Sequence, residues 1–174
     1  RISNTTQALE QAYSDMYGHG LQIVGAMRFL LTEPTDKQAR DNVEKSGEIF
    51  ATALEQARRV SVGDAGALSR LGIIMDNRKQ QIEVQRRIIE RLDAGDVAGA
   101  KDLYVREDNV IWRAYRVLIM DGLKEIRESA RQERSRFIEM AKKAEHQSLG
   151  VSLFVLLVAV LLGVWLTRRI AGPI

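Results

Sequence analysis

Small and apolar residues recur at alternating intervals of four and three along the first 147 residues, which is the spacing of one face of an α-helix. In the second predicted helix this face consists of Ala39, Val43, Ser46, Phe50, Ala53, Ala57 and Val60. In the third it consists of Leu68, Leu71, Met75, Arg78, Ile82, Gln85, Ile89 and Leu92. In the first it consists of Ile2, Thr6, Leu9, Tyr13, Met16, Gly20, Val24, Met27 and Leu31. Such a sustained repeat predicts long helices packed side by side.

Three groups of turn residues divide this region into four helices. Pro34 ends the first helix, and Thr35 or Asp36 caps the second. Residues 61–66 form the second turn, and Gly95–Asp96 provides a C-cap glycine followed by an N-cap aspartate. The predicted helices are 2–32, 36–61, 66–93 and 96–147. Short connections make consecutive helices antiparallel, so we predict an antiparallel four-helix bundle.

The C-terminal region has the composition of a membrane segment. Leu149–Leu166 contains 18 residues without a charge, and with its flanks this length matches a hydrocarbon core of roughly 30 Å. Trp165 stands near its end and Arg168–Arg169 follow, as at a membrane interface. The alternative is a buried core helix. We predict an all-α fold in which the last bundle helix continues into a transmembrane helix at 148–167.

Helix four is longer than its partners. If it starts level with the first turn, it passes the second turn near residue 126, and residues 127–147 extend toward the membrane. A matching extension of helix one and a first transmembrane helix are therefore expected upstream of residue 1. The predicted domains are 1–147, the bundle; 148–167, the membrane helix; and 168–174, the start of a linker.

Composition excludes several classes of function. With 26 basic and 23 acidic residues, the net charge of +3 does not indicate a nucleic-acid partner. The chain has no Cys and two His, so disulfides, thiol nucleophiles and a His-rich metal site are not expected. No nucleophile triad, phosphate-binding loop or HExxH motif is present. We therefore expect no enzymatic activity, metal or cofactor.

Three stretches resemble bacterial methyl-accepting chemotaxis proteins, the transmembrane chemoreceptors. Residues 167–174, TRRIAGPI, are similar to the opening of a HAMP linker directly after a membrane helix. Residues 16–34, MYGHGLQIVGAMRFLLTEP, resemble the first helix of the periplasmic sensor. Residues 92–104, LDAGDVAGAKDLY, are similar to the turn into helix four of such sensors. Together the last two cover about a fifth of the chain.

The resemblance implies a receptor in the bacterial inner membrane, with residues 1–147 in the periplasm or outside the cell. It implies a homodimer that detects a small molecule or a periplasmic binding protein. A displacement of helix four would pass through HAMP to a cytoplasmic kinase and adaptor, for chemotaxis. Two alternatives stay open: the sensor of a histidine kinase or diguanylate cyclase, and a membrane-anchored helical rod without a ligand.

Polar residues on the bundle seam suggest a ligand site. Arg78 and Gln85 occupy seam positions, and residues 110–120 are apolar nearly all round except for two arginines. Since a buried arginine needs an anionic partner, we predict a site for a small organic anion. Its predicted residues are Tyr17, His19, Arg28, Arg78, Trp112, Arg113, Tyr115 and Arg116. Alternatively, the arginines pair with internal acids or reach solvent.

Helix one carries two further features. A second stripe is predicted to form a homodimer face and consists of Ala8, Ala12, Asp15, His19, Gln22, Ala26 and Phe29. Three interior glycines, Gly18, Gly20 and Gly25, each lower helix stability by about 1 kcal/mol relative to Ala. Either they allow close helix packing, or they open the helix beside a ligand.

Overall fold

The computed structural model describes the backbone of residues 2–170 and the side chains of residues 4–140 and of Trp165. The chain divides into two compact units, Arg1–Ala130 and Arg131–Ile174. All regular elements in the described part of the chain are helices, which confirms the all-α prediction.

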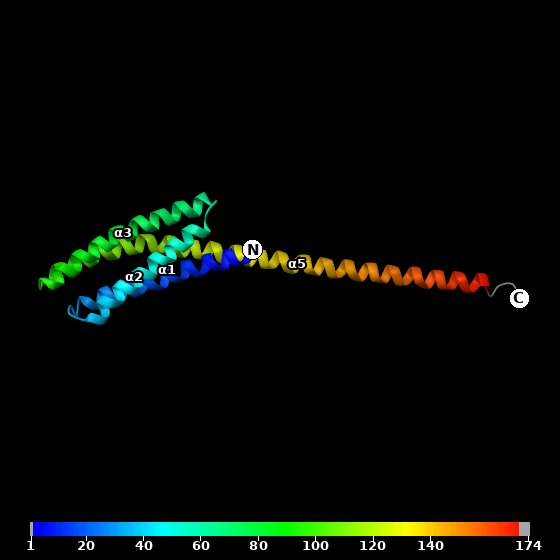
Figure 1. Cartoon of the computed structure of the whole chain (residues 1–174), viewed down its shortest axis with the longest axis horizontal. Coiled ribbons are helices and arrows are strands. Elements are labelled where there is room, and N and C mark those ends of the chain that lie inside the picture. Colours follow the sequence, from blue (N-terminus) through cyan, green and yellow to red (C-terminus); the bar gives the residue numbers. More distant parts are fainter. Residues whose placement is uncertain (1, 171–174) are drawn as a thin grey trace. The chain divides into compact units, whose positions relative to one another are not determined.

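Four helical stretches make up the fold (Figure 1). The first three are α1 (Ile2–Leu30), α2 (Lys37–Val60) and α3 (Ala65–Asp93). The fourth comprises α4 (Val97–Leu103), the π-helical turn η1 (Tyr104–Asp108) and α5 (Asn109–Ile170). In the first unit, α1, α2, α3 and the start of α5 lie side by side as a bundle. The bounds of the first three helices and the start of the fourth agree with the predicted ones to within two residues. The π turn was not predicted, and α5 ends at Ile170, beyond the predicted bundle boundary at residue 147.

An aspartate caps the start of three helices. Asp36, Asp64 and Asp96 each accept a hydrogen bond from the backbone N–H three residues further on, at 2.7–2.9 Å. Two turns contain a glycine with positive φ, Gly63 at 102° and Gly95 at 77°. Asp36, Asp96 and Gly95 therefore occupy the predicted turn positions, and the turns are short enough to keep consecutive helices antiparallel.

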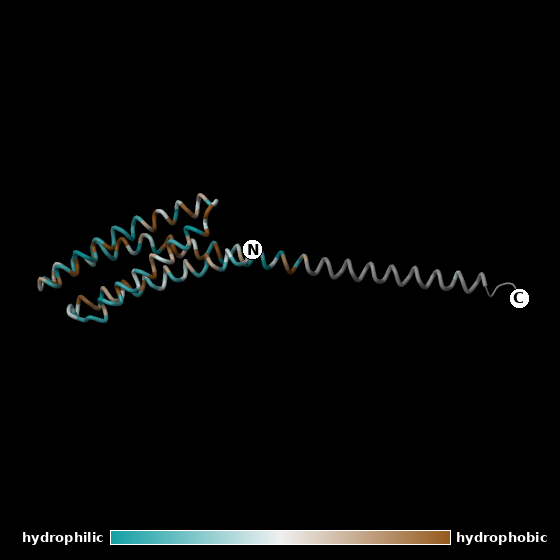
Figure 2. Tube along the Cα trace, in the orientation of Figure 1, coloured by the Kyte–Doolittle hydropathy of each residue, from teal (hydrophilic) through white to brown (hydrophobic). Residues whose placement is uncertain are grey.

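The core follows the predicted stripes closely in α2 and less closely elsewhere. Hydrophobic and hydrophilic positions alternate along each helix of the first unit (Figure 2). The buried residues of α2 are Ala39, Ser46, Phe50, Ala53, Leu54 and Ala57. In α1 the buried hydrophobic residues are Ala12, Tyr13, Met16, Ile23, Met27 and Leu30. Val24 and Leu31 of the predicted α1 stripe are only partly buried.

The predicted stripe of α3 is wrong in part. Ile82 is 52% exposed and Leu68 is 36% exposed, although both were expected in the core. Residues that the prediction omitted are buried instead, namely Ile74, Gln81, Val84 and Ile88. Adjacent apolar pairs such as Ile73–Ile74 and Ile88–Ile89 allow two different faces of this helix to show the four-and-three spacing. The packing of the neighbouring helices determines which of the two faces is buried.

Ion pairs between helices hold α5 next to both α1 and α3. Arg127 of α5 binds Glu10 of α1 at 2.8 Å, and Arg70 of α3 binds Glu125 of α5 at 2.7 Å. Further interhelical pairs are Arg40–Asp93 and Arg87–Glu107. These pairs are exposed or half-exposed, so each contributes at most about 1 kcal/mol and acts mainly on helix register.

Two glycines allow large aromatic side chains to reach the core between α1 and α5. A Cβ atom at Gly20 would lie 2.4 Å from the ring of Trp112, and one at Gly122 would lie 2.3 Å from the ring of Tyr13. A Cβ at Gly18 or Gly25 would meet nothing within 4 Å. Close packing therefore explains Gly20, whereas Gly18 and Gly25 border open space.

Among the residues searched, which are those the structure describes, no helix is both long and apolar enough to span a membrane. The predicted membrane segment, 148–167, lies outside the residues with described side chains apart from Trp165, and so does the predicted linker, 168–174.

We predict that Gly20→Ala destabilises the first unit by about 1–3 kcal/mol, because the buried Trp112 ring has to shift. Gly18→Ala is the matched control and should be neutral or stabilising by up to about 1 kcal/mol. Urea unfolding followed by Trp112 fluorescence in a Trp165→Phe background measures both. Equal effects of the two substitutions would contradict the packing role of Gly20.

Candidate functional site: an arginine-lined pocket beside a buried polar layer

A polar layer crosses the bundle core. Arg78 is 6% exposed, Gln85 is 3% exposed, and Gln81 and Asp108 are fully buried. Arg78 Nη1 donates to Gln81 Oε1 at 2.8 Å and to Gln85 Oε1 at 3.0 Å. The buried Tyr115 hydroxyl also donates to Gln81 Oε1. The guanidinium of a buried arginine is therefore held by amide oxygens and not by a carboxylate.

The π turn brings the fifth member into this layer. Buried residues on the fourth helical stretch include Ala100, Tyr104, Asp108 and Trp112, three successive steps of four residues. Steps of four drift around an α-helix, whereas a π turn has more residues per turn and keeps them on one face. The Asn109 N–H bonds the Tyr104 carbonyl across this turn. Asp108 consequently faces the core, although it follows two charged residues in the sequence.

The buried carboxyl of Asp108 has an unusual environment. Neither of its oxygens has a hydrogen-bond partner at standard geometry, and the same holds for the amide nitrogens of the neighbouring Gln81 and Gln85. Burial raises the pKa of Asp108 from 3.8 to about 6, although those two glutamines and the charge of Arg78 lower the pKa in part. Burial also lowers the pKa of Arg78 and raises that of Tyr115. Asp108 therefore keeps its proton to a higher pH than an ordinary aspartate does.

A separate pocket of about 390 Å³ lies between α1 and the η1–α5 segment. Three arginines contribute to its wall: Arg28 from α1, and Arg113 and Arg116 from α5. The remaining lining residues are Leu21, Val24, Gly25, Tyr104, Asn109 and Trp112. No acidic residue is among them, so the lining carries a formal charge of +3 from these three arginines. We call this the α1–α5 pocket.

Unsatisfied polar groups border the α1–α5 pocket. Arg116 Nε and the Tyr104 hydroxyl are buried and have no hydrogen-bond partner. Within the described part of the chain, none of the three pocket arginines has a carboxylate within ion-pair distance. Buried hydrogen-bond donors in proteins usually have a partner. A ligand that accepts hydrogen bonds from Arg116 Nε and the Tyr104 hydroxyl would supply the partners that these two groups lack.

The structure separates the predicted site residues into two groups. Arg28, Trp112, Arg113 and Arg116 meet in the α1–α5 pocket, while Arg78 and Tyr115 lie in the polar layer. His19 and Tyr17 line neither described pocket, although Nδ1 of His19 is buried without a partner. The structure therefore does not bring the predicted residues together in one pocket, because Arg78 lines a different pocket from Arg28, Arg113 and Arg116.

The predicted dimer stripe of α1 is partly covered by α2 of the same chain. Ala12 is 1% exposed, and Gln22 accepts a hydrogen bond from Ser46 of α2 at 3.0 Å. Ala12 thus belongs to the core and cannot contribute to a dimer face. Ala8, Asp15, His19 and Ala26 are half-buried, and Phe29 is 48% exposed.

Sequence reasoning missed Tyr104, Asp108 and Asn109. The run of four-residue steps from Ala100 to Trp112 was a usable signal for the first two, because it departs from the usual alternation of four and three. Asn109 follows from the π turn and has no separate signal. Across the described residues, no cluster of His, Asp and Glu is suited to a metal ion.

Comparison with protein-family models, with curated proteins and with solved structures gives no match for this chain.

We predict that Asp108→Asn removes a loss of folding stability that the parent protein shows as the pH rises. The pKa of Asp108 in the folded state, about 6, exceeds the ordinary value of 3.8. The stability that the protonated carboxyl contributes is therefore fully present below about pH 3.8 and is lost as the pH rises through about 6. The stability advantage of the variant should grow by about 2–3 kcal/mol between about pH 4 and about pH 8. Urea unfolding at several pH values measures this. Asp121→Asn, at an exposed position, is the control and should show no such growth.

Proposed function

We propose that this chain is the sensor region of a transmembrane chemoreceptor and that the α1–α5 pocket binds a small organic anion. The observation that carries the proposal is the convergence of Arg28, Arg113 and Arg116 on one pocket without a carboxylate partner in the described structure. Arg28 and Arg113 are exposed and can be solvated, whereas the half-buried Arg116 has a buried Nε without a partner, which a bound anion would supply. The proposal agrees with the resemblance in residues 16–34 and 92–104.

The chemistry of the pocket favours an anion with more than one negative charge. Each guanidinium offers a planar pair of donors that matches a carboxylate. The Tyr104 hydroxyl and Asn109 add neutral hydrogen-bonding groups, and Trp112 supplies an apolar wall. A dicarboxylate of succinate size can engage arginines from both α1 and α5. A monocarboxylate can engage only part of this set.

The proposed mechanism uses the position of the pocket between two helices. A dianion held by Arg28 on one side and by Arg113 and Arg116 on the other would favour one relative position of α1 and α5. The ligand has to bind the two signalling positions with different affinity. We propose that the shift of α5 passes through a membrane helix at 148–167 and a HAMP linker at 168–174 to a cytoplasmic kinase and adaptor. The bundle would then lie in the periplasm of a bacterial inner membrane.

Calorimetric titration of the purified chain with succinate tests the site, with acetate and inorganic phosphate as comparison anions. Arg113→Gln and Arg116→Gln should each weaken succinate binding by about tenfold or more, because each removes a charge-assisted hydrogen bond of about 1.5–3 kcal/mol. Arg59→Gln is the matched control, since Arg59 is exposed and outside both described pockets. Absence of binding for all three anions, or equal binding by the parent and both pocket variants, would refute the anion site.

We further propose a homodimer, and the exposed residues of α1 define where its contacts can lie. Phe29 and Leu21 are 48% and 41% exposed on this helix. Because the chain contains no cysteine, Phe29→Cys or Ala12→Cys introduces a single thiol. We expect oxidative crosslinking between chains at position 29 and none at position 12, which is buried within the chain. A crosslink at position 12 alone, or none at either position in membranes, would contradict this arrangement.

A further inference from the structure

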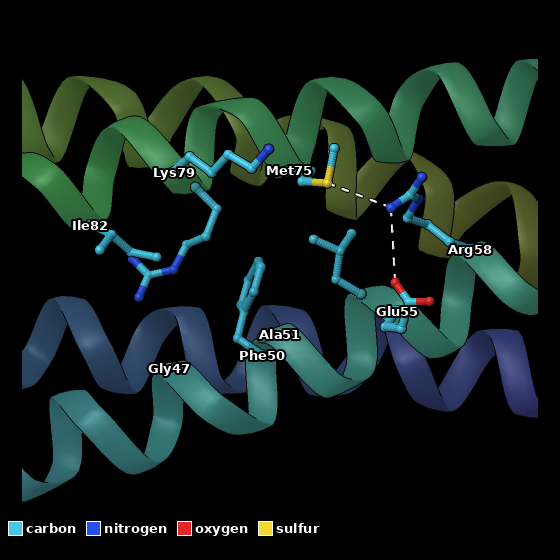
Figure 3. Close-up of a pocket in the computed structure, with 10 residues that line it drawn as sticks. Gly47, Phe50, Ala51, Glu55, Arg58, Met75, Lys79 and Ile82 are labelled. Carbon is cyan, nitrogen blue, oxygen red and sulfur yellow. Dashed lines mark hydrogen bonds and ion pairs between the residues drawn. The ribbon is translucent and has the colours of Figure 1, made fainter.

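A second pocket lies between α2 and α3, on elements that do not form the α1–α5 pocket (Figure 3). Its volume is about 250 Å³, below the roughly 300 Å³ at which sites for drug-sized ligands begin. Met75 and Ile82 provide apolar surface in it, and the buried side chains of Phe50 and Leu54 also line it. We call it the α2–α3 pocket. Its size limits it to a small ligand.

Arg78 gives this pocket a buried positive charge. Its side chain is more than nine-tenths buried, lines the pocket, and has no carboxylate within ion-pair distance among the described residues. Only Nη1 is used by the amide oxygens of Gln81 and Gln85. A Cβ atom at Gly47 would lie 3.5 Å from Arg78 Nη2. Because residue 47 has no side chain, the α2 side of the guanidinium is not covered at this position.

The other charges of the pocket also favour an anion. Its lining contains Arg58, Arg78 and Lys79 against the single acid Glu55, a formal charge of +2. Arg58 is 3.8 Å from Glu55 and contacts the sulfur of Met75 at 3.6 Å (Figure 3). Lys79 is 4.0 Å from Asp76. Both ion pairs are long and exposed, so they neutralise little of the charge that a ligand would meet.

The apolar lining of the pocket indicates that the uncharged part of the ligand is hydrophobic. The Phe50 ring lies under the Arg78 guanidinium, with 5.7 Å between Cζ and the ring centroid. Ile82 lines the pocket and is 52% exposed. Its apolar side chain is therefore in contact with water when the pocket has no ligand. A flat ring placed against Ile82 and Met75 would cover such surface while its acidic group reaches Arg78.

We propose that the α2–α3 pocket binds a small aromatic monocarboxylate, with the carboxylate paired to Arg78 and the ring against Ile82 and Met75. This site is additional to the α1–α5 pocket, which is larger, carries three arginines and suits a dianion. Either site can exist without the other, because they share no lining residue.

The test uses the full chain in detergent solution and 4-fluorobenzoate as the probe, with binding followed by ¹⁹F NMR line broadening. Gly47→Leu places a side chain over the guanidinium and removes no hydrogen-bonding group, so it should weaken binding by about tenfold or more. Gly18→Leu is the matched control, since it also replaces a helical glycine and meets nothing within 4 Å. It should change binding less than about twofold.

Two further measurements decide the assignment. Arg78→Gln should abolish 4-fluorobenzoate binding, and 4-fluorobenzyl alcohol, which lacks the charge, should bind the parent at least about tenfold more weakly. Because Arg78→Gln also disturbs the core, Gly47→Leu keeps the test independent of folding. Equal binding by Gly47→Leu and the parent, or no binding by the parent beyond a detergent blank, would overturn the proposal. Loss of binding in Arg113→Gln but not in Gly47→Leu would place the probe in the α1–α5 pocket and also overturn it.

Discussion

The packing of the bundle depends on how a buried arginine is accommodated. An ionised group in an apolar core is strongly destabilising unless other groups solvate it. Arg78 meets this requirement with two amide oxygens from its own helix and with the ring face of Phe50 from α2. The Tyr115 hydroxyl from α5 joins the same amide oxygen of Gln81. Arg78 and Gln81 of α3 thereby connect α2 and α5 at one level of the bundle.

The π turn adds a second ionisable group to this layer. It buries Asp108 close enough to Gln81 and Gln85 for both glutamines to lower the pKa of its carboxyl. Burial outweighs the attraction of Arg78 and keeps this carboxyl largely protonated at mildly acidic pH. Several polar atoms of this layer therefore lack hydrogen-bond partners. Such atoms are rare in the cores of natural proteins, and they call for an explanation other than fold stability.

The same layer lies between the two pockets. Phe50 lines the α2–α3 pocket and meets Tyr115 edge-on, with ring centroids 6.0 Å apart. Tyr115 meets Trp112 edge-on at 5.1 Å, and Trp112 lines the α1–α5 pocket. Gly20 provides the space that the Trp112 ring occupies. Phe50, Tyr115 and Trp112 thus form a continuous row of packed rings between the two pockets. A movement of Phe50 or Trp112 toward the core would press on Tyr115 between them.

The sequence by itself determined the helices, their caps and most of the α2 face, because these depend on local spacing and on turn residues such as Asp36 and Gly95. It also identified the arginines, since charges on an apolar stripe stand out. Only the tertiary structure decided that Arg78 lines a pocket between α2 and α3 while Arg113 and Arg116 border a separate pocket beside α1. It also decided that Ile82 is exposed and that Asp108 is buried. Helical spacing defines faces on each helix, but the rotation and height of one helix against another depend on packing between side chains distant in sequence.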